Sequence, residues 1–402
     1  MKTTQSLSKA IKRQGIFLCL LFLGTGIIAA EKIQDEWNDV SRIVAIGDIH
    51  GDYDNYVDVL REAGLINRRG NWTGEETHLV QVGDIPDRGP DTARIIAHLQ
   101  KLEKQASRDG GMVHVLIGNH EFMNVIGDLR YVHPGEYEAL TSRNSSRIRD
   151  GYYQQVVQAV AAQNEARVEA EEEPIIIDDA FKAQWYEEFP LGYVEHRLSW
   201  QPGGEFNDWV SKHNSIIKIN DILFMHAGLG PELLALSIQE INDKIRTEIL
   251  GDIDFNNNLG EAETGPLWYR GLAMNSQSDE APHLANLLDT YKVATVVVGH
   301  TPKLGIITPR FGGQVVITDT GISAYYGSYK ASMLIEDGKL FALQEGEYIP
   351  LPADDEGIIP YFQSQLNLTP ENERLKAHLE NLLNPVVEEV PKEASSEAIT
   401  DL

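Results

Sequence analysis

The sequence predicts an α/β sandwich in which two β-sheets are flanked by helices. Five short β-prone runs each end in Asp, Asn or His beside or near a glycine, which is typical of strands that deliver side chains to one edge of a sheet. The first three ends, at Asp48, Asp84 and Asn119, are each about 35 residues apart, an interval that suits a strand, a crossover helix and the next strand. Three later runs between turn-rich segments predict antiparallel strands of a second sheet, at residues 315–318, 331–335 and 340–343.

The first three runs open the predicted core, which begins at Arg42. A polar motif follows each of them: Gly47-Asp48-Ile49-His50-Gly51 after residues 43–46, Gly83-Asp84-Ile85-Pro86-Asp87-Arg88-Gly89 after residues 78–82, and Gly118-Asn119-His120-Glu121 after residues 113–117. Right-handed crossovers place the carboxyl ends of successive parallel strands at one edge of a sheet. We therefore expect the three motifs to lie side by side.

A long helix-forming stretch then interrupts this pattern, from about residue 124 to 213. Within it, residues 152–170 favour a helix, residues 165–179 are acidic, and no apolar run ends in a ligand-type residue. We interpret the stretch as a helical insertion that covers the sheet edge carrying the motifs. The acidic part is expected to be a solvated loop.

The pattern of strands and polar motifs resumes in the second half. Residues 222–225 end in His226-Ala227-Gly228, and residues 293–298 end in Gly299-His300-Thr301. Helical periodicity predicts helices at 232–250 and 283–291. Thr369-Pro370 begins a predicted capped helix with leucines on one face, and the acidic tail from residue 385 onward is expected to be disordered. The predicted organisation is a signal peptide at 1–30, a catalytic domain at 31–350, and a C-terminal helix and tail at 351–402.

The amino terminus has the order of a secretory signal peptide. Lys2, Lys9, Lys12 and Arg13 precede an apolar segment at 16–28, and small residues follow it. The segment falls short of the roughly 20 residues that span a bilayer, so we predict a cleaved signal and a periplasmic or secreted protein. An uncleaved membrane anchor is the alternative. Cys19 is the single cysteine of the chain, so the mature chain has no disulfide and no thiolate ligand or nucleophile.

The balance of charges excludes some partners. The chain has 402 residues and a formal net charge of −27. Such a charge repels nucleic acid and anionic membrane surfaces. We therefore expect no nucleic-acid partner and no stable membrane insertion after the signal is cleaved.

The residue types at the strand ends point to metal chemistry. Carboxylate, amide and imidazole ligands without sulfur suit divalent ions such as Mn, Fe, Co, Ni or Zn. The candidates exceed what one ion needs, and they fit two ions that share a bridging carboxylate. Such a pair acidifies a bridging water, so that hydroxide can attack phosphorus in line without a covalent enzyme intermediate.

The ordered motifs resemble those of a known family. Gly-Asp-x-His-Gly, Gly-Asp-x-x-Asp-Arg-Gly and Gly-Asn-His-Glu, in this order and spacing, resemble the phosphoprotein phosphatase branch of the metallophosphoesterases. The continuation at 118–131 and the segment Gly265-Pro266-Leu267-Trp268-Tyr269-Arg270 resemble the bacterial Shewanella-like phosphatases within it. The resemblance covers about residues 42–345 and implies a calcineurin-like fold, with two mixed β-sheets flanked by helices.

The resemblance also implies a role for each matched residue. It assigns Asp48 and His50 to the first ion, Asp84 to a bridge between both ions, and Asn119, His226 and His300 to the second ion. It makes His120 the general acid that protonates the leaving oxygen, oriented by Asp87. It assigns the phosphoryl oxygens to Arg88 and Arg270, whose guanidinium forks match them. It places Tyr325 on the substrate side, with Tyr326 as the rival.

Two positions depart from eukaryotic members of the family. Pro86 replaces the usual Val, and Ala227 replaces the usual Gly after His226. Both are neighbours of predicted functional residues and leave the ligands intact. They therefore bear on the substrate and not on the chemistry.

The predicted function is hydrolysis of phosphate monoesters in phosphoproteins or phosphopeptides. Phosphotyrosine is favoured, because the bacterial relatives resemble tyrosine-directed enzymes. A dinucleoside tetraphosphate hydrolase shares the first three motifs, but export argues against it; a broad phosphomonoesterase is a further alternative. The non-enzyme alternative is a metal- or phosphate-binding scaffold, which would be free to lose His120 and Asp87, yet both are present.

Overall fold

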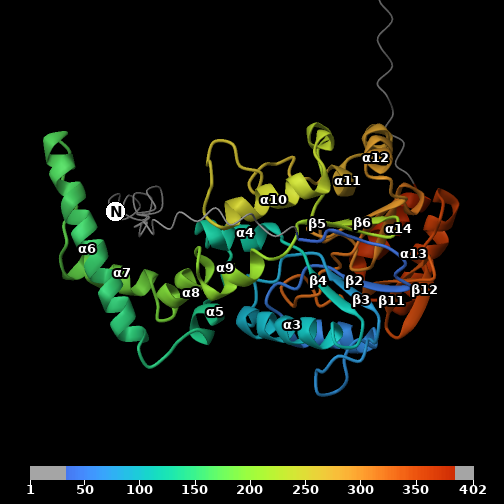
Figure 1. The fold of residues 1–402 in the computed structure, drawn as a ribbon, viewed down its shortest axis with the longest axis horizontal. Coiled ribbons are helices and arrows are strands. Elements are labelled where there is room, and N and C mark those ends of the chain that lie inside the picture. Colours follow the sequence, from blue (N-terminus) through green and yellow to red (C-terminus); the bar gives the residue numbers. More distant parts are fainter. Residues whose placement is uncertain (1–32, 385–402) are drawn as a thin grey trace, which may run out of the picture.

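The computed structural model describes residues 33–384. The predicted signal peptide and the tail from residue 385 onward lie outside the described residues, so both stay predictions. Within the described range, two mixed six-stranded sheets pack against each other and helices cover them on the outside (Figure 1). The predicted sandwich of two mixed sheets is confirmed.

One sheet carries the three motifs of the first half. Its strand order is β12-β11-β10-β2-β3-β4, and β2, β3 and β4 are parallel, as the spacing predicts. β10 pairs antiparallel with both β2 and β11, and β11 pairs antiparallel with β12. The strands span Arg42–Ile46 (β2), His78–Gln81 (β3), Met112–Val115 (β4), Ser332–Glu336 (β10), Lys339–Gln344 (β11) and Glu347–Pro350 (β12).

The other sheet has the order β1-β5-β6-β7-β9-β8. β6, β7 and β9 are parallel, β1 is parallel to β5, and β5 and β8 are antiparallel to their neighbours β6 and β9. The strands span Glu36–Trp37 (β1), Ile216–Ile219 (β5), Ile222–Met225 (β6), Thr295–Val298 (β7), Thr308–Arg310 (β8) and Val315–Ile317 (β9).

The sequence-based assignment of the last strands needs two corrections. Residues 315–317 form β9, which is antiparallel to β8, as predicted, but parallel to β7 on its other side. Residues 332–336 and 339–344 are antiparallel as predicted, but they extend the sheet of β2 and do not begin another sheet. Short runs of this kind reveal a strand but not its partner, because the partner is set by packing that the run itself does not encode.

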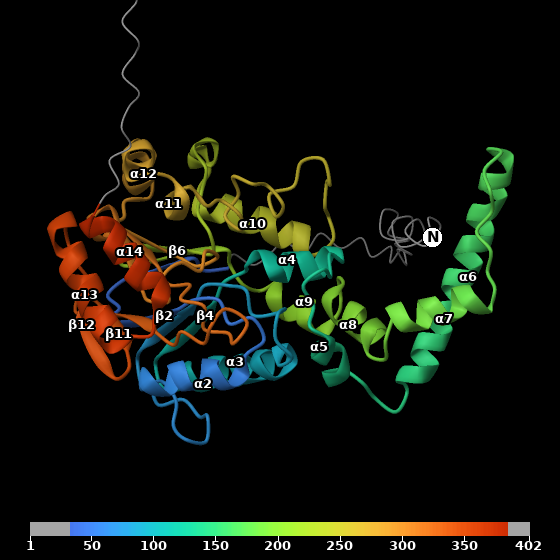
Figure 2. The ribbon, with the colours of Figure 1, turned by 180° about the vertical axis from the view of Figure 1, so that it is seen from behind.

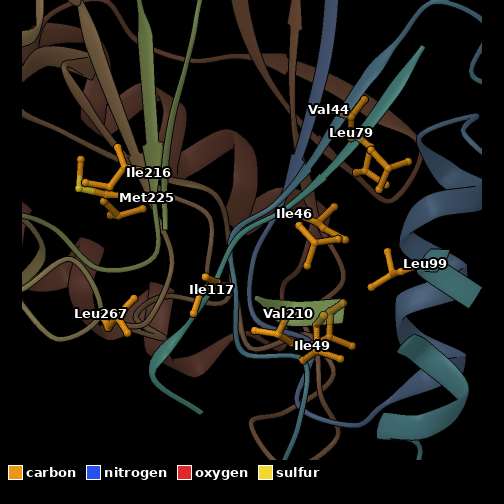
Figure 3. Close-up of a cluster of buried hydrophobic side chains, with 14 of the residues drawn as sticks. Val44, Ile46, Ile49, Leu79, Leu99, Ile117, Val210, Ile216, Met225 and Leu267 are labelled. Carbon is orange, nitrogen blue, oxygen red and sulfur yellow. The ribbon is translucent and has the colours of Figure 1, made fainter. Parts of the chain in front are cut away.

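Side-chain alternation in the strands explains why both faces of each sheet are buried. In β2, Ile43 and Ala45 belong to the cluster between the sheets, whereas Val44 and Ile46 belong to the cluster under the helices. Successive side chains of a strand point to opposite faces, which produces this division. Figure 3 shows Val44 and Ile46 on the same side of the sheet as Leu99 of α3.

Helices cover the outer face of each sheet (Figures 1 and 2). α2 (Tyr53–Glu62) and α3 (Thr92–Ala106) lie on the sheet of β2. α10 (Ile238–Ile249), α11 (Gly271–Met274) and α12 (Gln277–Tyr291) lie on the sheet of β6. α12 begins earlier than the sequence predicts, with Ser276 as its cap and Pro282 inside the helix. Three short 3-10 turns span Pro231–Ala235, Phe311–Gly313 and Asp355–Gly357.

Two helices follow the last strand where the sequence predicts one. α13 spans Ile358–Leu368 and α14 spans Glu373–Leu383, with Asn372 as the amino-terminal cap of α14. Pro360 lies in the first turn of α13, where a proline is tolerated. Side chains of both helices, including Tyr361 and Leu375, join the core between the sheets.

Part of the insertion after the third motif builds an arm rather than a cover. α4 (Asn119–Ile126) carries the third motif and leads into the insertion, whose helices are α5 (Pro134–Ala139), α6 (Ser145–Glu169), α7 (Asp179–Glu188), α8 (Tyr193–Trp200) and α9 (Glu205–Val210). Figures 1 and 2 show α6 and α7 extending away from the two sheets, so the prediction that the insertion covers the motif edge is wrong for these two helices. They pack on each other around a separate cluster of Tyr153, Val160, Phe181 and Trp185. In residues 33–384, no helix is long and apolar enough to cross a membrane.

Candidate active site

The predicted motifs meet at the carboxyl ends of β2, β3, β4, β6 and β7, which come from both sheets. The structure brings together eight predicted side chains there, and none of the eight is more than 5% exposed: Asp48, His50, Asp84, Asp87, Asn119, His120, His226 and His300. Parallel strands deliver their ends to the same edge, which explains the convergence.

Asp84 lies at the centre of this group. Its Oδ1 accepts a hydrogen bond of 2.9 Å from the backbone N–H of His120, in the first turn of α4. Its Oδ2 lies 3.4 Å from Nε2 of His226 and 3.8 Å from Nε2 of both His50 and His120. The ligand-type atoms form two groups that share Asp84, one with His50 and His120 and one with His226 and His300. A shared carboxylate is the arrangement that a bridge between two ions requires.

The atoms around His226 fit a bound cation. Nδ1 of His226 lies 2.8 Å from the carbonyl oxygen of Val82, and a carbonyl only accepts, so Nδ1 carries the proton. Nε2, the other ring nitrogen, faces Oδ1 of Asn119 at 3.0 Å and the Asp84 carboxylate at 3.4 Å. Nδ1 of His300 lies 3.1 Å from the same Nε2 of His226, whereas the other ring nitrogen of His300, Nε2, is buried and has no hydrogen-bond partner among the described residues. Acceptors that converge in this way suit a divalent metal whose imidazole ligand is oriented through its other nitrogen.

Asp48 connects the two sheets at the site. Both of its carboxylate oxygens accept the backbone N–H of His300 at 3.1 Å, and its Oδ2 lies 3.8 Å from Nε2 of His50. Burial raises the pKa of Asp48, and the nearby Asp319 and Asp84 raise it further. Buried carboxylates that crowd one another in this way favour a proton or a cation between them.

His120 is held by a chain of side chains that ends in α4. Its Nδ1 makes a short hydrogen bond with Oδ2 of Asp87, and Oδ1 of Asp87 accepts 3.1 Å from Nδ2 of Asn124. Burial acts to lower the pKa of His120, but Asp84 and Asp87 outweigh it and raise the pKa above the ordinary value. An imidazole that is oriented and keeps its proton near neutral pH suits general-acid catalysis.

The other protonation states also suit metal binding. Burial acts to raise the pKa of Asp84, but His226 and His120 lower it well below the ordinary value. Burial and the charge of His120 lower the pKa of His50 to about 3, and burial lowers the pKa of His300. Metals bind ionised carboxylates and neutral imidazoles, which are the forms that these shifts favour near neutral pH.

The glycines of the motifs leave room for the ligands. A Cβ atom on Gly118 would lie 2.3 Å from Oδ1 of Asp84, and one on Gly299 would lie 2.5 Å from Oδ1 of Asp48. The backbone is also strained here, since φ is +60° at Asp84 and +62° at His300. Side chains larger than glycine rarely adopt such angles, and they persist where the surrounding structure holds them.

Arg88 lies beside two tyrosines. Its guanidinium carbon is 3.8 Å from the ring centroid of Tyr131 and 4.7 Å from that of Tyr325. Nη1 donates a 3.1 Å hydrogen bond to the Tyr325 hydroxyl, while the buried Nε has no hydrogen-bond partner among the described residues. The group therefore retains donors for an anion, and the rings beside it offer aromatic surface.

Arg270 reaches the same site from the loop before α11. Its Nη1 donates to the backbone oxygen of His300 at 2.8 Å and to Oγ1 of Thr301 at 2.9 Å. Trp268, two residues earlier, meets the ring of His300 edge-on with 5.7 Å between centroids. Arg270 is thus attached to the loop of His300, and the residue as a whole is exposed.

The two rival tyrosines have different neighbours. Tyr325 is 60% exposed and accepts from Arg88. Tyr326 is half-buried and packs on His50, with 5.2 Å between ring centroids. Tyr325 therefore lies on the arginine side and Tyr326 on the ligand side of the site.

Two buried carboxylates were missed as site residues by sequence reasoning. Glu121 accepts backbone N–H groups of Gly118, Asp84 and Ile85 at 2.8, 3.0 and 2.7 Å, which ties the second and third motif loops together. Asp319 follows β9 and hydrogen-bonds Asp48, and burial raises its pKa to about 7. The sequence signal for Asp319 is an apolar run that ends in Thr-Asp-Thr-Gly. Because the sequence predicts an antiparallel strand there, its end is not expected at the edge where the parallel strands end.

Comparison with known proteins identifies the family. The profile described as calcineurin-like phosphoesterase matches residues 41–304. The chain belongs to the calcineurin-like phosphoesterases. The predicted fold and the predicted enzyme class, a metal-dependent phosphatase, are thereby confirmed.

Relatives of this phosphoesterase include proteins named as phosphatases. Shewanella-like protein phosphatase 1 of Plasmodium berghei is 28% identical over 88% of the chain and 85% of the relative. An uncharacterized protein of Schizosaccharomyces pombe is 33% identical over 76% of the chain and 80% of the relative. Among solved structures, the cold-active protein-tyrosine phosphatase of a psychrophilic Shewanella species has a TM-score of 0.61 at 27% identity, over 80% of this chain and 83% of that one. The resemblance to Shewanella-like phosphatases is confirmed.

Proposed function

We propose that this phosphoesterase hydrolyses phosphate monoesters of phosphoproteins or phosphopeptides at a two-metal centre, with phosphotyrosine favoured. The observation that supports the centre is Asp84, whose carboxylate belongs to both groups of ligand-type atoms. One ion would be held by Asp48, His50 and Asp84, and the other by Asp84, Asn119, His226 and His300. When bound, two such ions neutralise phosphoryl charge and acidify a water nucleophile. The oxygen and nitrogen donors suit Mn, Fe, Co, Ni or Zn.

His120 supplies the proton that the leaving group needs. Its Nδ1 is occupied by Asp87, so Nε2 is the nitrogen that faces the reacting group. The raised pKa of His120 keeps that proton available, and protonation of the leaving oxygen avoids an alkoxide or phenoxide product. Asp87 acts by holding the ring in place and by stabilising its charged form.

Arg88 and Arg270 bind the phosphoryl oxygens in this proposal. The unpartnered Nε of Arg88 and the exposed part of Arg270 provide donors in the planar arrangement that matches phosphate. Tyr325 fixes one end of Arg88 through its hydroxyl. The phosphoryl group is thereby held next to both groups of metal ligands.

The substrate class rests on two supports. Relatives are named as protein phosphatases, and the similar Shewanella structure is that of a protein-tyrosine phosphatase. In addition, the rings of Tyr131 and Tyr325 beside Arg88 offer an aromatic surface on which a phosphotyrosine ring can pack. A phosphoserine side chain has no ring to use that surface.

The test compares three substrates with the metal-reconstituted chain: a phosphotyrosyl peptide, a phosphoseryl peptide of the same sequence, and diadenosine tetraphosphate. We expect the phosphotyrosyl peptide to have the highest kcat/KM, and Asp84→Asn to abolish its turnover. Equal rates on the two peptides would remove the tyrosine preference. Turnover of the dinucleotide alone would replace the substrate class, and no turnover of any substrate would favour a binding scaffold.

We further propose that the chain is exported and that its signal is removed near residue 30. The support is the order of basic, apolar and small residues at the amino terminus. Expression of the full chain in a bacterium, followed by fractionation and amino-terminal sequencing, tests this. A processed chain in the periplasm or medium is expected, whereas an intact chain in the membrane fraction would support the anchor.

A further inference from the structure

A hollow of about 290 Å³ lies between α2, the start of α3 and the loop between α2 and β3. Four arginines and two aspartates line it together with Tyr53. The arginines are Arg61, Arg68, Arg69 and Arg94. Such a gathering of cations stands out in a chain whose formal net charge is −27, because most of its surface repels anions.

Two of these arginines are free to bind an anion. Arg61 lies 3.4 Å from Asp58, and Arg94 lies 3.8 Å from Asp54. No carboxylate in residues 33–384 forms an ion pair with Arg68 or Arg69, and both side chains are exposed. The two aspartates therefore offset only part of the positive charge, and the free guanidiniums match carboxylate groups in a two-pronged geometry.

The loop that carries Arg68 and Arg69 is held in place by hydrogen bonds to its backbone atoms. Oδ1 of Asn67 accepts the backbone N–H of Arg69 at 2.8 Å and that of Asn71 at 3.2 Å. The oxygen of Gly70 accepts from His98 and from Lys101, both at 2.8 Å. A loop fixed in this way presents its side chains without first having to become ordered, which favours binding.

The hollow begins at Tyr53, which is close along the chain to His50 of the proposed active site. Tyr53 opens α2 three residues after His50, and the cap of α2, Asp52, accepts the backbone N–H of Ala324 at 2.8 Å. Ala324 adjoins Tyr325, which contacts Arg88. From Tyr53 the hollow continues along α2 to Arg61, a distance of about 12 Å at the helical rise. An extended peptide covers that distance with about four residues.

From this geometry we propose that the hollow is an accessory subsite for acidic side chains of the peptide substrate. It takes glutamate or aspartate residues roughly four to six positions from the phosphorylated residue. The inference rests on the proposed function, since it concerns the same substrate. Its ligand is an acidic peptide segment, and its determinants are Arg68 and Arg69.

Three phosphotyrosyl peptides of equal length test the subsite. One carries three glutamates four to six positions before the phosphotyrosine, one carries them after it, and one has glutamines at all these positions. For the wild-type chain we expect one glutamate peptide to exceed the glutamine peptide about fivefold in kcat/KM, the effect of two exposed ion pairs. The double variant Arg68→Gln/Arg69→Gln should reduce that ratio to about one, through KM, and leave hydrolysis of a small aryl phosphate unchanged.

A matched control removes two positive charges elsewhere. Lys104 and Arg108, at the far end of α3, are exposed and do not line the hollow. Lys104→Gln/Arg108→Gln should keep the wild-type ratio, whereas about 0.5 M salt should abolish it by screening. The subsite would be overturned if the wild type hydrolysed the glutamate and glutamine peptides with equal kcat/KM, or if the preference for glutamate survived in Arg68→Gln/Arg69→Gln. Neither result would contradict the proposed function.

A binding measurement separates the two hypotheses if no peptide is hydrolysed. Fluorescence anisotropy of the labelled glutamate and glutamine peptides reports binding without turnover. Tighter binding of the glutamate peptide that is lost in Arg68→Gln/Arg69→Gln would keep the subsite and reject the proposed function. Equal binding of the two peptides would reject the subsite as well.

Discussion

The buried ligand-type residues of the active site, here called the ligand cluster, and the arm of α6 and α7 are held together by different interactions. At the cluster, carboxylates and imidazoles from five strand ends are almost fully buried and held by backbone donors. In the arm, two helices share a small apolar cluster of their own, and Val168 and Ile176 are 62% and 73% exposed. The cluster depends on both sheets, whereas the arm has a small apolar cluster of its own and contacts the rest of the molecule through α8.

This difference indicates where the molecule tolerates change. Buried polar groups that face one another are costly to disturb, because each loses its partner in a medium of low dielectric. A small satellite cluster can open locally while the main core remains folded. Substitutions in the cluster should therefore alter chemistry or metal binding, and substitutions in the arm should alter local order.

After the loss of turnover in Asp84→Asn, the next largest catalytic effect is expected for His120→Asn. Loss of the general acid should lower kcat for a phosphopeptide by about 10² to 10⁴, while both ions remain bound. Steady-state kinetics together with metal analysis of the purified variant checks this. Loss of an ion in the variant would instead make His120 a ligand, which its place in the group with His50 and Asp84 also allows.

Asp319→Ala should weaken metal binding by about 10- to 100-fold, as loss of a group that orients a ligand does. The reason is the hydrogen bond between Asp319 and Asp48. Titration calorimetry with Mn²⁺ or Zn²⁺ measures this change in metal affinity. Asp319→Asn is the control, because its amide can still donate to Asp48, and this variant should retain most of the metal affinity. An equal loss of metal affinity in both variants would show that the carboxylate itself is needed.

Asp87→Asn should move the pH profile as well as reduce the rate. Because Asp84 and Asp87 raise the pKa of His120, the acid keeps its proton as pH rises, and activity declines only above the raised pKa. Removal of the Asp87 charge lowers that pKa, so the alkaline decline of kcat/KM should begin at a lower pH. If the alkaline decline of kcat/KM stayed at the same pH in Asp87→Asn, a group other than His120 would control that decline.

The smallest effect on catalysis is expected from the arm. Trp185→Ala removes a residue that is 3% exposed from the arm cluster, a change that costs about 3–5 kcal/mol in a packed core. Limited proteolysis between α6 and α7 should accelerate, while hydrolysis of an aryl phosphate should change less than about twofold if the arm unfolds alone. Phe224→Ala, in the core between the sheets, should lower the melting temperature of the whole protein, and a similar loss from Trp185→Ala would contradict the independence of the arm.

The sequence predicts the ligand cluster better than the arm, for a physical reason. A strand that ends in Asp-x-His-Gly encodes both its own conformation and the place of its last side chains, since parallel strands end at one edge. Helical propensity likewise indicates α6. The direction of a helix depends on what it packs against, so local patterns do not predict the orientation of the arm. Local patterns also do not predict the partner of a strand, which explains why the sequence did not indicate the parallel pairing of β9 or the contact of Asp319 with Asp48.

Metal stoichiometry tests the central claim most directly, namely that Asp84 is shared by two metal sites. The chain and its Asp84→Asn variant are freed of metal, loaded with Mn²⁺ or Zn²⁺, and analysed for bound ions per chain. We predict two ions in the wild type and at most one in Asp84→Asn, with the fold retained by circular dichroism. A single ion in the wild type, or two tightly bound ions in the variant, would contradict the shared carboxylate.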